Sequence, residues 1–189
     1  MTWETELIRF FGYHPLKSMS TSETMVYKAR TKGSLAVAKI ACSPEYAEDL
    51  QEERDRLAEN QDLEWMPRLI RYQDYLGSTP EEDRILELFH KEGWTMSNPV
   101  ILLKEFTLGV SLSKFPGAKL NGRQYLNVRH QVDEMHSRNY AGLDIVPCNI
   151  LVQGPTLATL FDLGPSLSAK SFSERKYDDV MSLASLLQE

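Results

Sequence analysis

Short runs of hydrophobic residues, separated by polar turn signals, fill the first half of the chain. Residues 25–29 and 35–40, joined by a Lys-Gly turn signal, predict two consecutive antiparallel strands. Residues 1–15 suit either a short helix or a strand, and the apolar spacing does not decide between them. Further predictions are a strand at 67–75, a polar exposed loop at 77–83, and strands at 85–89 and 100–106.

Three longer segments carry helix signals. Ser43 followed by Pro44 predicts a capped helix start, and this helix is expected to reach about residue 60. Asn121 predicts the N-cap of a second helix that extends to His136, a residue more typical of a packed core than of an acid or base. Residues 177–187 predict a third, amphipathic helix with an acidic first turn.

Polar residues adjoin two short apolar runs near the end of the chain. Residues 149–152 and 157–161 flank a Gly-Pro turn signal and predict two buried strands joined by a tight turn. Asp144, Asn149 and Asp162 lie beside these strands, and a buried carboxylate without a partner costs several kcal/mol. Mg²⁺ bound together with a phosphate would compensate such groups. The alternative is an ordinary β-hairpin with polar ends.

The same residues resemble the catalytic loop of the protein-kinase superfamily. In that pattern an aspartate is followed five positions later by an asparagine, as Asp144 is followed by Asn149. Residues 161–164, Phe-Asp-Leu-Gly, are similar to the metal-binding Asp-Phe-Gly motif. The resemblance implies that Asp144 is catalytic and accepts or orients the proton of the attacking hydroxyl. It also implies that Asn149 and Asp162 hold Mg²⁺ on the phosphates of ATP.

An Ala-Val-Ala-Lys segment ending at Lys39 is similar to the kinase strand whose lysine reaches the α- and β-phosphates. The resemblance implies a catalytic and ATP-binding role for Lys39, paired with a glutamate of the following helix. Glu53 is the expected partner because it lies on the apolar face of that helix, and Glu52 is the alternative. Taken alone, Lys39 would equally suit an exposed strand position, and the helix a solvated charged surface.

The loop that covers the phosphates in kinases is rich in glycine, but here it has none. Ser20, Thr21 and Ser22 stand in its place, and their hydroxyl or backbone N–H groups are the expected phosphate ligands. This acidic, glycine-poor segment is closer to the small kinases of the KEOPS complex. The small size of the chain likewise favours a trimmed kinase of the KEOPS or lipopolysaccharide-core type.

Residues 105–109 resemble the hinge segment whose backbone binds adenine in kinases. Glu105 and Thr107 are therefore expected to bind the nucleotide. Lys104 takes the preceding gatekeeper position, where lysine is unusual. Either the alignment shifts by one residue at this point, or the adenine pocket is atypical.

Three further departures from the kinase pattern affect function. Leu143 replaces the arginine that serves control by a phosphorylated activation loop, and Val146 replaces a lysine that contacts the transferring phosphoryl group. The short stretch between Gly164 and Asp179 leaves no room for a long activation segment. Asp179 matches the kinase aspartate that holds the backbone of the catalytic loop, although an ordinary amphipathic helix would carry the same residues.

Composition narrows the possible partners and compartment. The 189 residues are 42% hydrophobic and 25% charged, which is ordinary for a globular domain. A net charge of −6 argues against non-specific binding to nucleic acid or anionic membranes, and no apolar run is long enough to span a bilayer. Without a secretory signal, and with Cys42 and Cys148 far apart, a reduced cytoplasmic setting is expected.

These observations predict an α+β, bilobal, protein-kinase-like fold. Residues 1–106 would form an N-terminal lobe with a small antiparallel sheet and one helix, and residues 107–189 a reduced, mainly helical lobe with the catalytic loop. The expected function is transfer of the γ-phosphate of ATP, with Mg²⁺, to a hydroxyl of a protein partner or of the chain itself. The alternatives are a nucleotide-binding pseudokinase that serves as a partner-binding scaffold, and a small-molecule kinase.

Overall fold

The chain divides into two compact units of α+β structure. The structure is a computed structural model, and it describes residues 2–18, 25–94, 96–162 and 170–187. The first unit comprises Met1–Asp62 and Pro67–Phe106, and the second comprises Leu63–Met66 and Thr107–Glu189. The predicted α+β class and the antiparallel sheet are confirmed.

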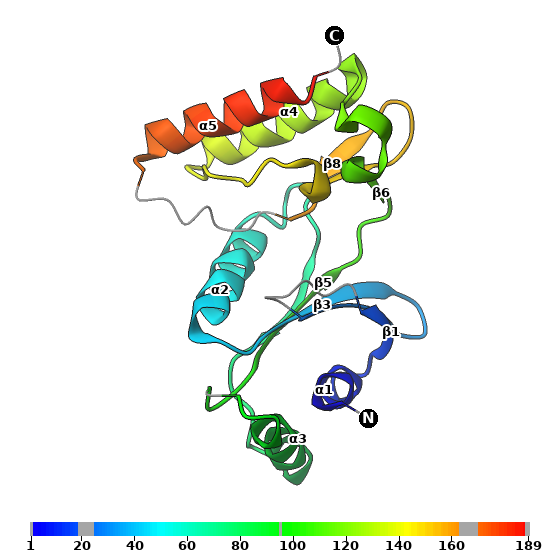
Figure 1. The fold of residues 1–189 in the computed structure, drawn as a ribbon, viewed down its shortest axis with the longest axis vertical. Coiled ribbons are helices and arrows are strands. Elements are labelled where there is room, and N and C mark those ends of the chain that lie inside the picture. Colours follow the sequence, from blue (N-terminus) through cyan, green and yellow to red (C-terminus); the bar gives the residue numbers. More distant parts are fainter. Residues whose placement is uncertain (1, 19–24, 95, 163–169, 188–189) are drawn as a thin grey trace. The chain divides into compact units, whose positions relative to one another are not determined.

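A five-stranded antiparallel sheet forms the centre of the first unit (Figure 1). The strands are β1 His14–Ser18, β2 Met25–Arg30, β3 Leu35–Ala41, β4 Leu69–Gln73 and β5 Val100–Glu105. Their spatial order is β1-β2-β3-β5-β4, so β1 and β4 are the edge strands and β3 and β5 are neighbours inside the sheet. Its helices are α1 Trp3–Phe10, α2 Pro44–Glu59 and α3 Pro80–Lys91.

Helices cover both faces of this sheet (Figure 1). Alternate residues of the inner strands, such as Ile40 of β3 and Leu103 of β5, join one buried cluster with α1 and α3. In that cluster the Trp3 and Phe89 rings lie edge to face with their centroids 4.8 Å apart. The intervening residues of β3 and β5 face α2. The sheet therefore separates an apolar core from a second layer that includes charged groups.

Helix α3 corrects the predictions of an exposed loop at 77–83 and a strand at 85–89. Thr79 caps this helix by accepting a hydrogen bond from the Glu82 N–H at 3.2 Å, and Pro80 occupies the first turn. Ile85 and Phe89 lie four residues apart and are buried on one helical face, as a 3.6-residue period requires. The described residues of the first unit accordingly form three helices, whereas one was predicted.

Most other predicted elements of the first unit are confirmed. The strands at 25–29, 35–40, 67–75 and 100–106 correspond to β2, β3, β4 and β5. Helix α2 begins after Ser43, whose side chain accepts from the Tyr46 N–H. Residues 1–15, left undecided by the sequence, form α1 followed by the start of β1.

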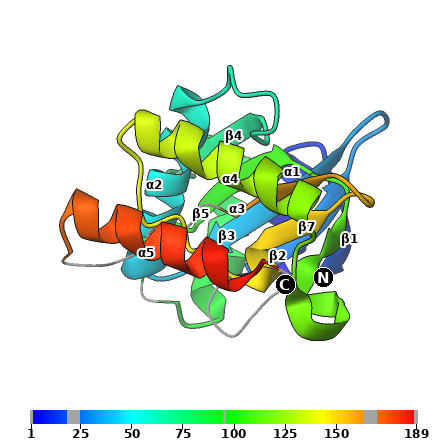
Figure 2. The same cartoon turned by 90° about the horizontal axis from the view of Figure 1, so that it is seen from above.

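In the part of the second unit that the structure describes, a small sheet is combined with two α-helices that lie side by side (Figure 1, Figure 2). The predicted hairpin is confirmed, and so is the helix that begins after Asn121, which caps it in a capping box. The helix predicted at 177–187 is present but begins at Phe172, so that Asp178 and Asp179 lie beyond its first turn. The elements are β6 Val110–Ser111, β7 Ile150–Val152, β8 Ala158–Leu160, α4 Gly122–Ser137 and α5 Phe172–Ser185. None of the helices formed by the described residues has both the length and the apolar character that a bilayer crossing requires.

A side chain of α4 completes the hydrogen bonding of the edge strand β8. The Gln131 Oε1 atom accepts from the Leu160 N–H at 2.9 Å, and its Nε2 group donates to the Ala158 carbonyl at 3.2 Å. The buried amide thus stands where a neighbouring strand would bond. It fixes β8 immediately before Phe161 and Asp162.

Replacing Phe89 with alanine tests the helical assignment of residues 80–91. We expect Phe89→Ala to lower the free energy of unfolding by about 3–5 kcal/mol, because it removes a fully buried ring from the core. Glu87→Ala, on the exposed face of α3, should change it by less than about 0.5 kcal/mol. Urea denaturation followed by circular dichroism measures both, and equal losses for the two variants would contradict the assigned face.

Candidate functional site

Three charged side chains meet in the interior of the first unit. The Lys39 Nζ atom lies 2.8 Å from Glu53 Oε2, and the Lys104 Nζ atom lies 2.5 Å from Glu53 Oε1. Their relative exposures are only 8% for Lys39, 3% for Glu53 and 2% for Lys104. Each oxygen of the Glu53 carboxylate therefore accepts from a different lysine, and we call this group the lysine–glutamate–lysine cluster.

The predicted pairing of Lys39 with Glu53 is confirmed. The alternative, Glu52, has an exposed side chain whose carboxylate lies 3.9 Å from Arg56. Glu53 takes the inner position because it lies on the same helical face as the buried Leu50 and Leu57. The apolar face that docks α2 on the sheet thus carries the carboxylate to the lysines.

The sheet register brings the two lysines together. Lys39 on β3 is paired with Leu102 on β5, and Val37 is paired with Lys104. Alternate residues of a strand share a face, so Lys39 and Lys104 are diagonal neighbours on the face that α2 covers. The contact of Lys104 with Glu53 was not predicted. Its signal was a lysine directly after four apolar strand residues, a setting in which a buried ammonium group needs an anionic partner.

Five further residues were expected to bind the nucleotide, and the structure describes two of them, Glu105 and Thr107. Ser20, Thr21 and Ser22 lie outside the described residues. Glu105 is exposed at the end of β5, and its backbone N–H donates to the Arg68 carbonyl at 2.8 Å. Thr107 is half-buried and belongs to the second unit.

In the second unit Asp144 adopts an unfavourable backbone conformation. Its φ angle is +47°, a left-handed value that is uncommon for residues other than glycine, and its side chain is exposed. The Asn149 Nδ2 group donates to the Asp144 carboxylate oxygen Oδ2 at 2.8 Å and to its carbonyl oxygen at 3.1 Å. A strained residue held by specific hydrogen bonds is a frequent feature of functional sites.

Asp179 of α5 holds the backbone that leads into Asp144. Its carboxylate accepts from the N–H groups of Gly142 and Leu143, each at 2.8 Å, and is 4% exposed. The buried His136 ring lies with its Nε2 atom 2.9 Å from the same carboxylate. The expectation that Asp179 holds this loop is confirmed, and the alternative of an acidic residue in the first turn does not apply, because α5 begins at Phe172.

The β7–β8 hairpin brings Asn149 and Asp162 to the same end of the small sheet. Ile150 pairs with Leu160, and the next pair outward is joined by a 3.2 Å hydrogen bond from the Phe161 N–H to the Asn149 carbonyl. Asp162 follows directly and is half-buried. The Asn149 amide donates through nitrogen to Asp144, which leaves its oxygen as the atom suited to a hard cation.

Asn149 and Asp162 carry oxygen atoms of the kind that Mg²⁺ prefers in proteins. Within the described ranges no group of three or more His, Cys, Asp or Glu side chains is placed to hold a metal ion. Mg²⁺ usually takes one or two carboxylate or amide oxygens from the protein and completes its shell with water and phosphate oxygens. Asn149 and Asp162 are the two residues expected to form such a pair.

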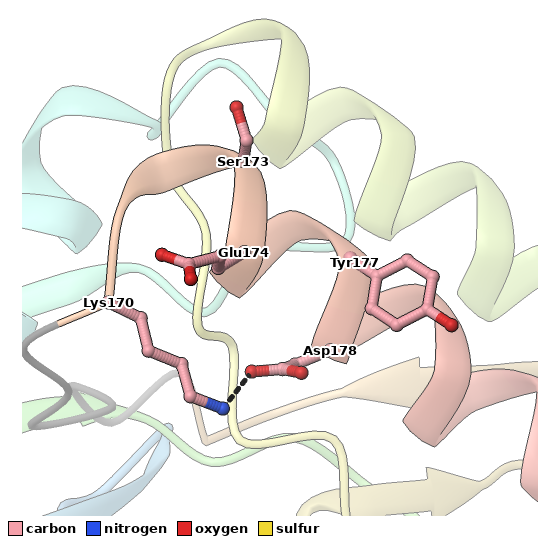
Figure 3. A pocket seen from close by; sticks show the side chains of 5 residues that line it. All are labelled: Lys170, Ser173, Glu174, Tyr177 and Asp178. Carbon is pink, nitrogen blue, oxygen red and sulfur yellow. Dashed lines mark hydrogen bonds and ion pairs between the residues drawn. The ribbon is translucent and has the colours of Figure 1, made fainter.

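An open pocket of about 350 Å³ lies elsewhere in the second unit. Its lining comes from Lys170 and the first turns of α5, with an ion pair between Lys170 and Asp178 at 2.7 Å (Figure 3). None of the predicted site residues lines it. The polar groups of this pocket are exposed. One of them, the Glu174 carboxylate, accepts hydrogen bonds from the hydroxyl and the backbone N–H of Ser171, the N-cap of α5, and these bonds lower the pKa of the Glu174 carboxyl.

Comparison with protein-family models gives no match for this chain, and comparison with curated proteins gives none.

Removing the Asp179 carboxylate should destabilise the protein strongly. Asp179→Ala leaves two buried N–H groups without acceptors, and each orphaned donor costs about 1–3 kcal/mol, so we expect a loss of about 3 kcal/mol or more. The neighbouring Asp178→Ala should leave stability nearly unchanged, because its ion pair is exposed. Urea denaturation measures both, and a small effect of Asp179→Ala would contradict the proposed hold on the loop.

The two cysteines should differ in reactivity. Burial, with smaller contributions from Glu4 and Glu92, raises the pKa of the Cys42 thiol to about 12, whereas Cys148 is exposed in the loop after Asp144. Since the thiolate is the reactive form, maleimide at neutral pH should label only Cys148 in the folded protein. Mass spectrometry of the labelled peptides measures this, with urea-unfolded protein as the control in which both react. Labelling of Cys42 without unfolding would contradict its burial.

Proposed function

We propose that this chain is a protein-kinase-like phosphotransferase with a bilobal kinase-like fold, which transfers the γ-phosphoryl group of ATP to a hydroxyl. The observation that carries the proposal is the ordered loop of the second unit. Asp144 is exposed there at a positive φ angle and bonded by Asn149, while Asp179 fixes the preceding backbone. An exposed carboxylate held in this way is suited to accept a proton from an incoming hydroxyl.

Asp144 would act on the acceptor. Its carboxylate would take or orient the hydroxyl proton as the hydroxyl oxygen bonds to the γ-phosphorus and the bond from that phosphorus to the bridging oxygen breaks, releasing ADP. The Asn149 bond to Oδ2 orients the carboxylate and leaves its other oxygen, Oδ1, outside that bond. The loop backbone stays in place because its N–H groups bond to a buried carboxylate.

Asn149 and Asp162 would hold Mg²⁺ through oxygen atoms. The ion, when bound with ATP, neutralises charge on the phosphates. The hairpin register places both residues at one end of the small sheet, and the Gln131 bonds to β8 fix the approach to Asp162.

Lys39 would bind the α- and β-phosphates, with Glu53 holding its ammonium group in place. A buried carboxylate orients the lysine and compensates part of its desolvation, as in the lysine–glutamate pair that kinases require for activity. The support for this role is the confirmed pairing of the two side chains.

The acceptor proposed first is a serine or threonine of a protein partner, or of the chain itself. A second candidate is a nucleotide-binding scaffold that does not turn ATP over. The observation that favours the second candidate is the half-buried, apolar Val146, two residues after Asp144, where kinases place a phosphate-binding lysine. Without that charge the transferring phosphoryl group loses one source of stabilisation.

Radiolabelled ATP tests these proposals. We expect purified protein with Mg²⁺ to transfer label from γ-labelled ATP to protein, and Asp144→Ala and Asp162→Ala to lower the rate at least about a hundredfold. Asp133→Asn, an exposed aspartate of α4 paired with Arg129, is the matched control and should retain full activity. Circular dichroism should show all three variants folded.

Each other outcome contradicts the first proposal in a distinct way. Binding of Mg²⁺-ATP in a thermal-shift assay without label transfer would favour the scaffold. Label that appears in an added pool of small hydroxyl compounds, and never on protein, would favour a small-molecule kinase. Label transfer that survives both aspartate substitutions would remove the assigned roles.

A further inference from the structure

We infer that Lys104 is a positioning residue: it holds the Glu53 carboxylate so that Glu53 and Lys39 stay aligned before any nucleotide binds. The kinetic part of this inference rests on the proposed phosphotransfer. The structural part, the fixing of α2 through Glu53, does not depend on it. Hydrogen–deuterium exchange and melting temperatures test the structural part, and KM and kcat for ATP test the kinetic part.

The contacts of the cluster give Lys104 this role. Its Nζ atom lies 2.5 Å from Glu53 Oε1, while Lys39 occupies the other oxygen at 2.8 Å. A carboxylate bonded through one oxygen can still rotate and swing with its helix. A carboxylate bonded through both oxygens to separate strands can do neither without breaking a buried, charge-assisted hydrogen bond.

The topology extends this constraint to a whole element. Lys39 comes from β3, Lys104 from β5 and Glu53 from the middle of α2. Since β3 and β5 are hydrogen-bonded neighbours, the sheet holds the two lysines at a fixed spacing. Helix α2 is therefore fixed to two strands by one side chain, and the Lys39–Glu53 pair should persist without a nucleotide or a partner protein.

Burial argues against the alternative that Lys104 itself binds the nucleotide. The exposed fraction of the Lys104 side chain is 2%, compared with 10% for Lys39. An incoming phosphate would reach the Lys39 ammonium group more readily than that of Lys104. We therefore assign contact with the phosphates of ATP to Lys39, and the holding of the Glu53 carboxylate to Lys104.

Lys104→Met tests the inference, because methionine keeps an unbranched side chain and removes the charge. Hydrogen–deuterium exchange of the nucleotide-free protein should show faster exchange concentrated in α2. The KM for ATP should rise about tenfold with kcat changed less than about threefold, because ordering of Lys39 then occurs on binding and affects ground and transition states alike.

Leu103→Ala is the matched control. Leu103 precedes Lys104 on β5 but is buried in the core cluster on the opposite face of the sheet. In the Leu103→Ala variant, hydrogen–deuterium exchange should become faster at α1 and α3 rather than at α2. The KM of this variant for ATP should equal that of the unchanged protein. The comparison is made after the two variants have been shown to have similar melting temperatures.

A double substitution checks that Lys104 acts through Glu53. Glu53→Gln leaves two ammonium groups near a neutral amide, so adding Lys104→Met should restore part of the melting temperature that Glu53→Gln loses. If the double variant instead loses as much melting temperature as the two single variants together, Lys104 does not act through Glu53. This result would overturn the coupling whether or not the protein turns over ATP.

The outcomes separate failure of the inference from failure of the proposed function. If the unchanged protein neither binds nor turns over ATP, the proposed function is wrong. The hydrogen–deuterium exchange and the double substitution then still show whether Lys104 fixes α2 through Glu53. If Lys104→Met raises the KM but leaves exchange in α2 unchanged, Lys104 contacts the nucleotide and the inference is wrong. If ATP turnover is present and neither quantity changes, the inference is also wrong.

Discussion

One carboxylate between two lysines is the interaction on which the first unit depends. An ionised group in a protein interior loses its hydration, and its attraction to a partner compensates this loss only when the geometry is good. Glu53 meets that condition with two charge-assisted hydrogen bonds, one to each of two adjacent strands. The cluster therefore ties the position of α2 to the register of the sheet, since neither can shift without leaving a charge uncompensated.

The second unit uses a buried carboxylate in a different way. Asp179 accepts from two backbone N–H groups and lies within hydrogen-bond distance of His136, so it fixes the path of a loop rather than the angle of a helix. Backbone donors are permanent features of the chain and do not titrate. The segment before Asp144 thus gains a fixed shape from a single side chain of α5, and Asn149 orients the Asp144 carboxylate itself.

Local capping signals in the sequence account for helices α2, α3 and α4, whereas contacts set by strand register cannot be predicted from it. Ser43 and Asn121 act as caps where expected, and Thr79 with Pro80 carries the same signal, although residues 77–83 are predicted as a loop. Five apolar-rich residues at 85–89 fit a strand or a helix equally, and only the preceding cap decides between them. Candidate residues in recognisable motifs could be named, but the partner of Lys104 depends on strand register, which the sequence pattern does not specify.

The backbone of Asp144 links this architecture to the proposed phosphotransfer. Among the described residues, Ala118, Asn139 and Asp144 are those other than glycine with positive φ, and only Asp144 is both preceded by a segment held through a buried carboxylate and bonded by an amide side chain. Left-handed geometry costs about 1–2 kcal/mol for most residues and less for aspartate, and the Asn149 amide bonds both the carbonyl and the carboxylate of Asp144 in that conformation. Hydrogen bonds that maintain a strained, solvent-facing carboxylate contribute little to a core. Under the proposed phosphotransfer, this arrangement would set the position of the carboxylate that receives the hydroxyl proton.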